Sequence, residues 1–160
     1  MGKPAARVSD TTAHGSGLAP GPGSTNVFIG GQPAWRGMSA AAVAALLAAV
    51  KKAAEDVAKA QAAATAAQGT PAGPAAQANV AKTAAEGVAR IASMLAGSGA
   101  DNHACPIVKV VIPDGPGVVI SGSQTVLING LPACRMGDTL QEATAVNSVA
   151  AGLPTVMIGD

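Results

Sequence analysis

The side chains with the clearest capacity for chemistry in this sequence are its two histidines and one of its two cysteines. His14 lies four positions after Asp10, while His103 and Cys105 follow Asp101 by two and four positions. Two imidazoles and a thiolate suit tetrahedral Zn²⁺, with iron as a second choice. The pattern therefore predicts a metal site built from distant segments, which would stabilise strands too short to bury much surface themselves.

The fourth ligand is left open by the sequence, because several side chains could supply it and water could complete the shell. Asp114 is the first candidate, with Glu142, which follows Asp138, or Cys134 as substitutes. Cys134 ranks low because it sits beside a predicted turn at the opposite end of the domain. The plainer alternative leaves both histidines as exposed turn residues and Cys105 as a small core side chain.

An internal repeat defines the elements that must position these residues. The pattern Gly-X-Pro-Ala-X-Arg occurs at residues 2–7, 31–36 and 130–135, and a β-branched run precedes the second and third copies. Each copy is predicted to form a tight turn and an antiparallel return, with Asn-Gly at the third copy as a strong hairpin signal. A similar run, residues 156–158, ends the sequence where a fourth unit would begin. Three units of about 30 residues each favour a compact β structure with pseudo-threefold symmetry.

The arginine and the aspartate of each unit are expected to stabilise the fold. Catalytic contacts of the three arginines are less favoured than ion pairs to Asp10 or Asp138 across the units. Asp101 is the aspartate of the second unit, delayed by an insertion. The structural motif is expected to comprise Pro4, Ala5, Ala6, Arg7, Asp10, Pro132, Ala133, Arg135 and Asp138, with Arg36 in the second unit.

An alanine-rich stretch, residues 39–98, interrupts the second unit and is predicted to form a helical hairpin. Ser39 is a natural N-cap, and apolar residues recur at helical spacing on both sides of a Gly- and Pro-rich break at residues 68–74. The predicted domains are thus a discontinuous β unit, residues 1–38 plus 99–160, and this inserted hairpin. Charged residues interleave with the alanines, which argues against a stable membrane span and leaves either a hairpin packed on itself or a helical dock for a partner.

Composition excludes several functions. The 160 residues are 49% hydrophobic but only 1% aromatic, and the net charge is +1. Without a basic block or stacking aromatics, neither double-stranded nor single-stranded nucleic acid has a binding surface. No apolar run follows the first residues, so no secretory signal peptide is expected. Most apolar residues are Ala and Val, which predicts a thin core.

These segments, taken in order, resemble the PAAR-repeat family. Residues 2–7 and 130–135 resemble the Pro-Ala-Ala-Arg repeat that names the family, and residues 5–14 resemble its short N-terminal prePAAR motif. Residues 103–106 and 121–130 are similar to the central signature. The resemblance covers both flanks of the chain and leaves the alanine-rich insert unexplained, although relatives that carry effectors have hydrophobic inserts after the prePAAR segment.

The resemblance implies a mainly β fold, a small cone-shaped pseudo-threefold domain of short strands interrupted by the inserted α-helical hairpin. PAAR proteins cap the trimeric VgrG spike of the bacterial type VI secretion system, sharpen it for membrane puncture and adapt effectors to it. Their metal, usually zinc, is held near the vertex by His and Cys, and His14, His103 and Cys105 fall on such ligand-bearing positions. Relatives often have His-Gly where this chain has Asp114 and a glycine, and a Cys-containing turn at residues 139–142.

The implied function is that of a structural tip protein rather than an enzyme, held in the bacterial cytoplasm before firing and then secreted into target cells. Its partners would be a VgrG spike and, through residues 39–98, an effector or a chaperone. Two alternatives are a small zinc-dependent enzyme with an open metal position and the N-terminal delivery module of a longer toxin effector. The enzyme is less favoured, because few acids lie near the ligands and no aromatic side chains form a pocket wall.

Overall fold

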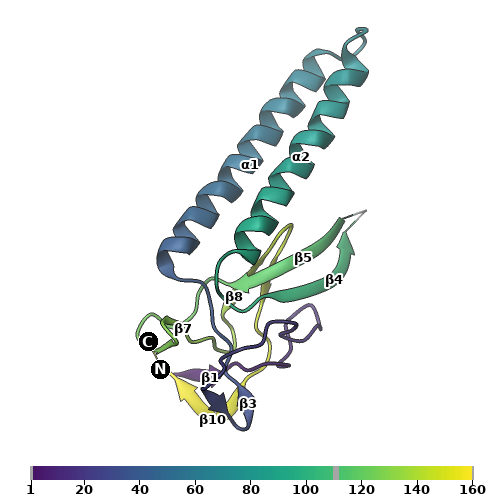
Figure 1. The fold of residues 1–160 in the computed structure, drawn as a ribbon. Coiled ribbons are helices and arrows are strands. Elements are labelled where there is room, and N and C mark those ends of the chain that lie inside the picture. The colour runs from purple at the N-terminus through teal and green to yellow at the C-terminus, as the bar shows by residue number, and fades with distance from the viewer. Residues whose placement is uncertain (1, 110–111, 160) are drawn as a thin grey trace.

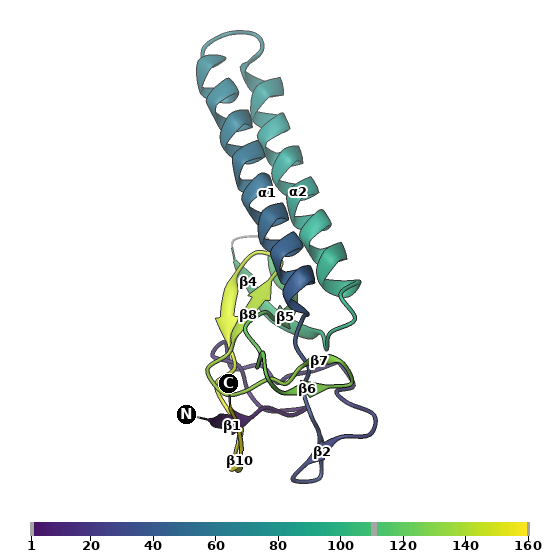
Figure 2. The same cartoon turned by 90° about the vertical axis from the view of Figure 1, so that its left-hand side faces the viewer.

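The structure is a computed structural model that describes residues 2–109 and 112–159. Short strands form one end of the molecule, and two long helices form a rod that extends away from it (Figure 1 and Figure 2). This arrangement is the predicted one, a small β domain interrupted by a helical hairpin. In chain order the elements are β1 (Lys3–Ala5), β2 (Phe28–Ile29), β3 (Gln32–Pro33), α1 (Ala40–Ala66), α2 (Gly73–Ala96), β4 (His103–Lys109), β5 (Ile112–Val119), β6 (Leu127–Ile128), β7 (Leu131–Pro132), β8 (Thr139–Glu142), β9 (Val146–Ser148) and β10 (Leu153–Ile158).

Three short antiparallel hairpins repeat the same pairing. β2 pairs with β3, and β6 pairs with β7. The turn between β6 and β7 holds Asn129 and Gly130 at φ values of 53° and 78°, the left-handed conformation that a type I′ turn requires. The third hairpin consists of β10 and β1, which come from opposite ends of the chain. Residues 156–158 therefore complete the first unit, and the expectation that they begin a fourth unit is wrong, because β1 has no preceding strand to pair with.

A closed ring of backbone hydrogen bonds joins the three units. The N–H of Ala6 donates to the carbonyl of Cys134 at 2.9 Å, that of Cys134 to Trp35 at 3.1 Å, and that of Trp35 back to Ala6 at 3.0 Å. Each unit thus donates to one neighbour and accepts from the other, as pseudo-threefold symmetry requires. Alanines and isoleucines at equivalent positions of the units form the adjoining core, namely Ala5, Ala34, Ala133, Ile29, Ile128 and Ile158.

Each unit also carries an Arg–Asp ion pair, which lies within the unit. The expected pairing across units is wrong, because each aspartate also accepts a hydrogen bond from the backbone N–H of its own arginine. The partners lie three positions apart in the first and third units and 65 apart in the second, where the helices intervene. The pairs are Arg7–Asp10, Arg36–Asp101 and Arg135–Asp138, with Nη2 to Oδ1 distances of 2.9, 2.8 and 3.0 Å.

The helices α1 and α2 fill most of the predicted insert and run antiparallel (Figure 2). Ser39 caps α1, since its Oγ accepts from the N–H of Ala42 at 3.4 Å. Gly87 allows close approach, because a Cβ there would lie 3.0 Å from the Cβ of Ala53. No described helix has the length and apolar character needed to cross a membrane. The base of the hairpin packs against β5 through Met38, Leu46, Ile91, Leu95, Ala100, Val118 and Ala143.

The remaining strands form an antiparallel sheet in the order β4–β5–β8–β9, between the ring of hairpins and the helical rod (Figure 1). Its register pairs Cys105 with Gly115 and Gly117 with Glu142. A thiol and two acids that lie far apart in the sequence are therefore brought to one end of this sheet.

Candidate metal centre

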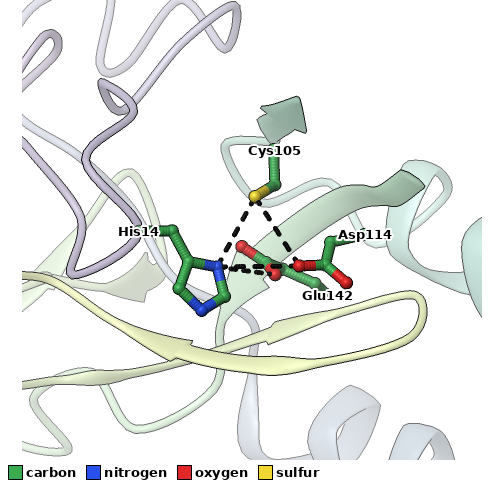
Figure 3. A group of neighbouring side chains, drawn as sticks. All are labelled: His14, Cys105, Asp114 and Glu142. Carbon is green, nitrogen blue, oxygen red and sulfur yellow. Dashed lines mark hydrogen bonds and ion pairs between the residues drawn. The ribbon is translucent and has the colours of Figure 1, made fainter. Parts of the chain in front are cut away.

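Four side chains from four segments converge beside this sheet (Figure 3). Cys105 lies on β4, Asp114 on β5 and Glu142 at the end of β8, while His14 comes from the segment between β1 and β2. One ligand atom from each lies within 4.8 Å of the other three. Three of them are the ligands proposed from the sequence, and Glu142, proposed as a substitute, joins them.

The distances between the donor atoms suit a shared cation. His14 Nδ1 lies 3.5 Å from Cys105 Sγ, 3.8 Å from Asp114 Oδ2 and 3.3 Å from Glu142 Oε2, and Sγ lies 4.0 Å from Asp114 Oδ2. Donors that bind a tetrahedral metal at about 2.0–2.3 Å lie about 3.3–3.8 Å from one another. The cluster therefore has nearly the dimensions that a four-coordinate divalent ion requires.

Burial makes the cluster costly without a cation. Asp114 and Glu142 are 0% exposed, and Glu142 Oε2 has no hydrogen-bond partner among the described residues. Burial, followed by the neighbouring charges of Glu142 and Asp114, raises the pKa of the Cys105 thiol. A bound divalent metal would neutralise the carboxylates and hold the sulfur as a thiolate, so these residues fit such an ion. His14, whose side chain is 22% exposed, leaves a route from solvent.

His103 lies beside the cluster rather than in it. Its Nδ1 donates to the carbonyl of Gly17 at 2.8 Å, which fixes the orientation of the ring. Its Nε2 lies 3.4 Å from Ser16 Oγ and 3.5 Å from Glu142 Oε1. The structure thus places Glu142 in the group of four donors where the sequence had suggested a second imidazole.

Cys134 lies far from this role, inside the ring of hydrogen bonds. It is 0% exposed and packs with Ala6 and Trp35, and burial raises its pKa well above the usual value. A thiol so enclosed in apolar surroundings is a core residue, and it is not in the group of donors around His14.

Two residues at the site were not anticipated from the sequence. Thr144 Oγ1 donates to Asp114 Oδ1, and Asn147 Nδ2 donates to Glu142 Oε1, each at 2.8 Å. Both follow β8 closely, in a short turn where Thr and Asn are ordinary residues. Nothing in their types or spacing could therefore have distinguished them from plain turn residues.

The comparisons with known proteins agree with this architecture. The sequence model of the PAAR motif matches residues 83–146 and 111–160, which include Cys105, Asp114 and Glu142 but not His14. Neither a curated protein nor a solved structure matches the chain. With the motif spanning the second half of the chain and three units closed into a ring, the chain is a PAAR-repeat protein, of the family related to the spike tip of type VI secretion.

Proposed function

We propose that this protein is a metal-stabilised tip that caps a trimeric VgrG spike and is carried with it from the bacterial cytoplasm into target cells. The observation that supports capping is a set of three exposed apolar side chains at equivalent positions of the three hairpins. Phe28, Leu127 and Met157 are 59%, 57% and 54% exposed. Each pairs with a proline of its own hairpin, Pro33, Pro132 and Pro4.

A threefold set of apolar side chains fits a threefold partner. The hairpins lie at the end of the molecule away from the tip of the helical rod (Figure 1 and Figure 2). Large exposed apolar side chains gathered in one region mark interaction sites. One copy of the chain can therefore present a similar contact to each subunit of a trimer, although its own sequence is not threefold symmetric.

Co-purification with the VgrG trimers encoded in the same genome tests this proposal. The wild-type chain should bind with one copy per trimer, and Phe28→Asp, Leu127→Asp or Met157→Asp should weaken binding. Val108→Asp is the matched control, since Val108 is 58% exposed but lies on β4, outside the three hairpins. Equal loss of binding in the control, or full binding by all three hairpin variants, would contradict the proposed surface.

The proposed cofactor is Zn²⁺, with iron as the second choice, held by His14, Cys105, Asp114 and Glu142. Four protein donors match the closed sites in which zinc stabilises a fold, whereas catalytic sites keep one position for water or substrate. This donor set favours a structural tip over the alternative of a small zinc enzyme. Elemental analysis of protein purified without chelators should find one metal ion per chain, and Cys105→Ala should remove it.

The helical hairpin is proposed to carry the effector or chaperone contact. One side of it has an apolar groove of about 520 Å³ whose larger lining residues are Val50, Val57, Val88 and Ile91. A groove elsewhere on the hairpin is lined by charged residues as well, Asp56, Lys59, Glu86 and Arg90. The amphipathic character favours a dock for a partner over a hairpin that is stable by itself alone.

Trimming the rod separates this contact from folding. Replacing residues 55–85 by a short Gly-Ser linker keeps the base that packs on β5, where Leu46, Ile91 and Val118 lie. The trimmed chain should still bind VgrG but lose cargo delivery into target cells. Unchanged delivery would show that the distal rod carries no cargo contact.

A further inference from the structure

The two carboxylates of the metal centre divide their oxygens in the same way. Asp114 accepts from Thr144 Oγ1 with Oδ1, while its Oδ2 faces Cys105 and His14. Glu142 accepts from Asn147 Nδ2 with Oε1, while its Oε2 faces His14. In both acids one oxygen is thus held from outside and the other is directed into the cluster.

Both outer donors come from one tight turn that connects β8 to β9. The N–H of Glu142 donates to the carbonyl of Ala145 at 2.8 Å, which closes the turn. The buried Gln141 side chain reinforces it, because its Nε2 donates to the carbonyls of Glu142 and Ala145 at 2.8 and 3.1 Å. The N–H of Ala143 reaches across to the carbonyl of Asp114 at 3.0 Å. The turn is therefore fixed both internally and to the strand that carries Asp114.

The orientation of the Asn147 amide is set by its own neighbours. The backbone N–H of Ser148 donates to Asn147 Oδ1 at 2.8 Å, so this atom must be the carbonyl oxygen. The amide nitrogen then faces Glu142 Oε1 and can only donate to it. Asn147 is 6% exposed, so water does not compete freely for this bond.

We propose that Thr144 and Asn147 are positioning residues that hold Asp114 and Glu142 in the orientation that binds metal, an inference that rests on the metal site of the proposed function. A carboxylate without its outer hydrogen bond can rotate, and its inner oxygen then leaves the cluster. Loss of one such partner typically lowers metal affinity about 10- to 100-fold. The same range is expected here for each residue, with the four donors themselves unchanged.

The test measures Zn²⁺ affinity by chelator competition and the coordination geometry from the visible spectrum of Co²⁺ bound to the full chain. Thr144→Val keeps the shape and removes the hydroxyl, and Thr144→Ser restores it. Asn147→Ala removes the amide donor. Thr155→Val, on the exposed side of β10, is the matched control. Thermal unfolding of each metal-free variant shows whether the turn still folds.

The expected result is a 10- to 100-fold loss of affinity with an altered Co²⁺ spectrum in Thr144→Val and Asn147→Ala. Thr144→Ser and Thr155→Val should behave as the wild type. Wild-type affinity and spectrum in both variants would overturn the positioning role while leaving the metal site itself intact. A wild-type chain that binds neither ion would overturn the metal site, and the positioning role with it.

Discussion

The three Arg–Asp pairs offer one interaction at three depths of burial, and replacing each aspartate by alanine should destabilise the fold in order of that depth. The side-chain exposures of arginine and aspartate are 19% and 10% in the first unit, 16% and 1% in the second, and 4% and 0% in the third. In every unit the aspartate accepts from the backbone N–H, Nε and Nη2 of its arginine. The chemistry lost is therefore the same in all three variants.

The magnitudes follow from what happens to the arginine left behind. Without Asp138, the guanidinium of Arg135 loses its ion-pair partner in the core, and breaking a buried pair from one side costs about 3–5 kcal/mol. Arg7 can turn toward water when Asp10 is removed, so we expect about 1–2 kcal/mol there, largely from the lost hydrogen bonds. Asp101→Ala should fall between, at about 2–4 kcal/mol, since Arg36 is almost as exposed as Arg7 but Asp101 is buried.

Urea unfolding of the three variants, at one fixed zinc concentration and followed by far-ultraviolet circular dichroism, measures these differences. The expected order of the loss in unfolding free energy is Asp138→Ala, then Asp101→Ala, then Asp10→Ala. Three equal losses would show that the backbone contact, which all three share, carries the energy instead of the ion pair. An order with Asp10→Ala first would refute the argument from burial.

Chelation should lower the unfolding temperature of the wild-type chain in calorimetry, because an ion at 1,000 times its dissociation constant adds about 4 kcal/mol; the difference should be much smaller in Glu142→Gln. Burial raises the pKa of Asp138, against the opposing effect of Arg135, so the folded chain binds a proton there at higher pH than the unfolded chain. Urea titrations from neutral to mildly acidic pH should therefore show the wild type gaining stability relative to Asp138→Asn as the pH falls, and a relative loss would contradict this sign. Gly87→Leu would force a side chain against Ala53 and separate the helices, so it should lower the helical circular dichroism signal and leave VgrG binding unchanged.

The repeat made most of the fold predictable, because its small residues have strict local requirements. The Asn-Gly pair at residues 129–130 occupies the left-handed turn that its type favours, and Asp101 pairs with Arg36 despite the helices between them. The sequence could not reveal that β10 pairs with β1, since a strand at the end of a chain looks the same whether it begins a new unit or completes the first.

The site was less predictable than the fold, because ligand choice depends on side-chain orientation. His103 and Cys105 are two positions apart on β4, yet the carbonyl of Gly17 holds the His103 ring outside the group of four. Glu142 enters instead through the register that pairs β8 with β5. Neither the hydrogen bond to Gly17 nor that register can be derived from residue types and spacing.

The position of the donors relative to the repeat explains why a metal suits this fold. His14, Cys105 and Glu142 each follow the aspartate of their own unit, Asp10, Asp101 and Asp138, by four positions. Each unit therefore contributes one donor from the equivalent place, and Asp114 from β5 supplies the fourth outside the symmetry. The backbone ring and the shared core join the units on the side of the hairpins, where strands of two or three residues bury few apolar side chains. An ion bound by one donor of each unit would join the same three units a second time, which compensates for the small core that an alanine- and valine-rich sequence allows.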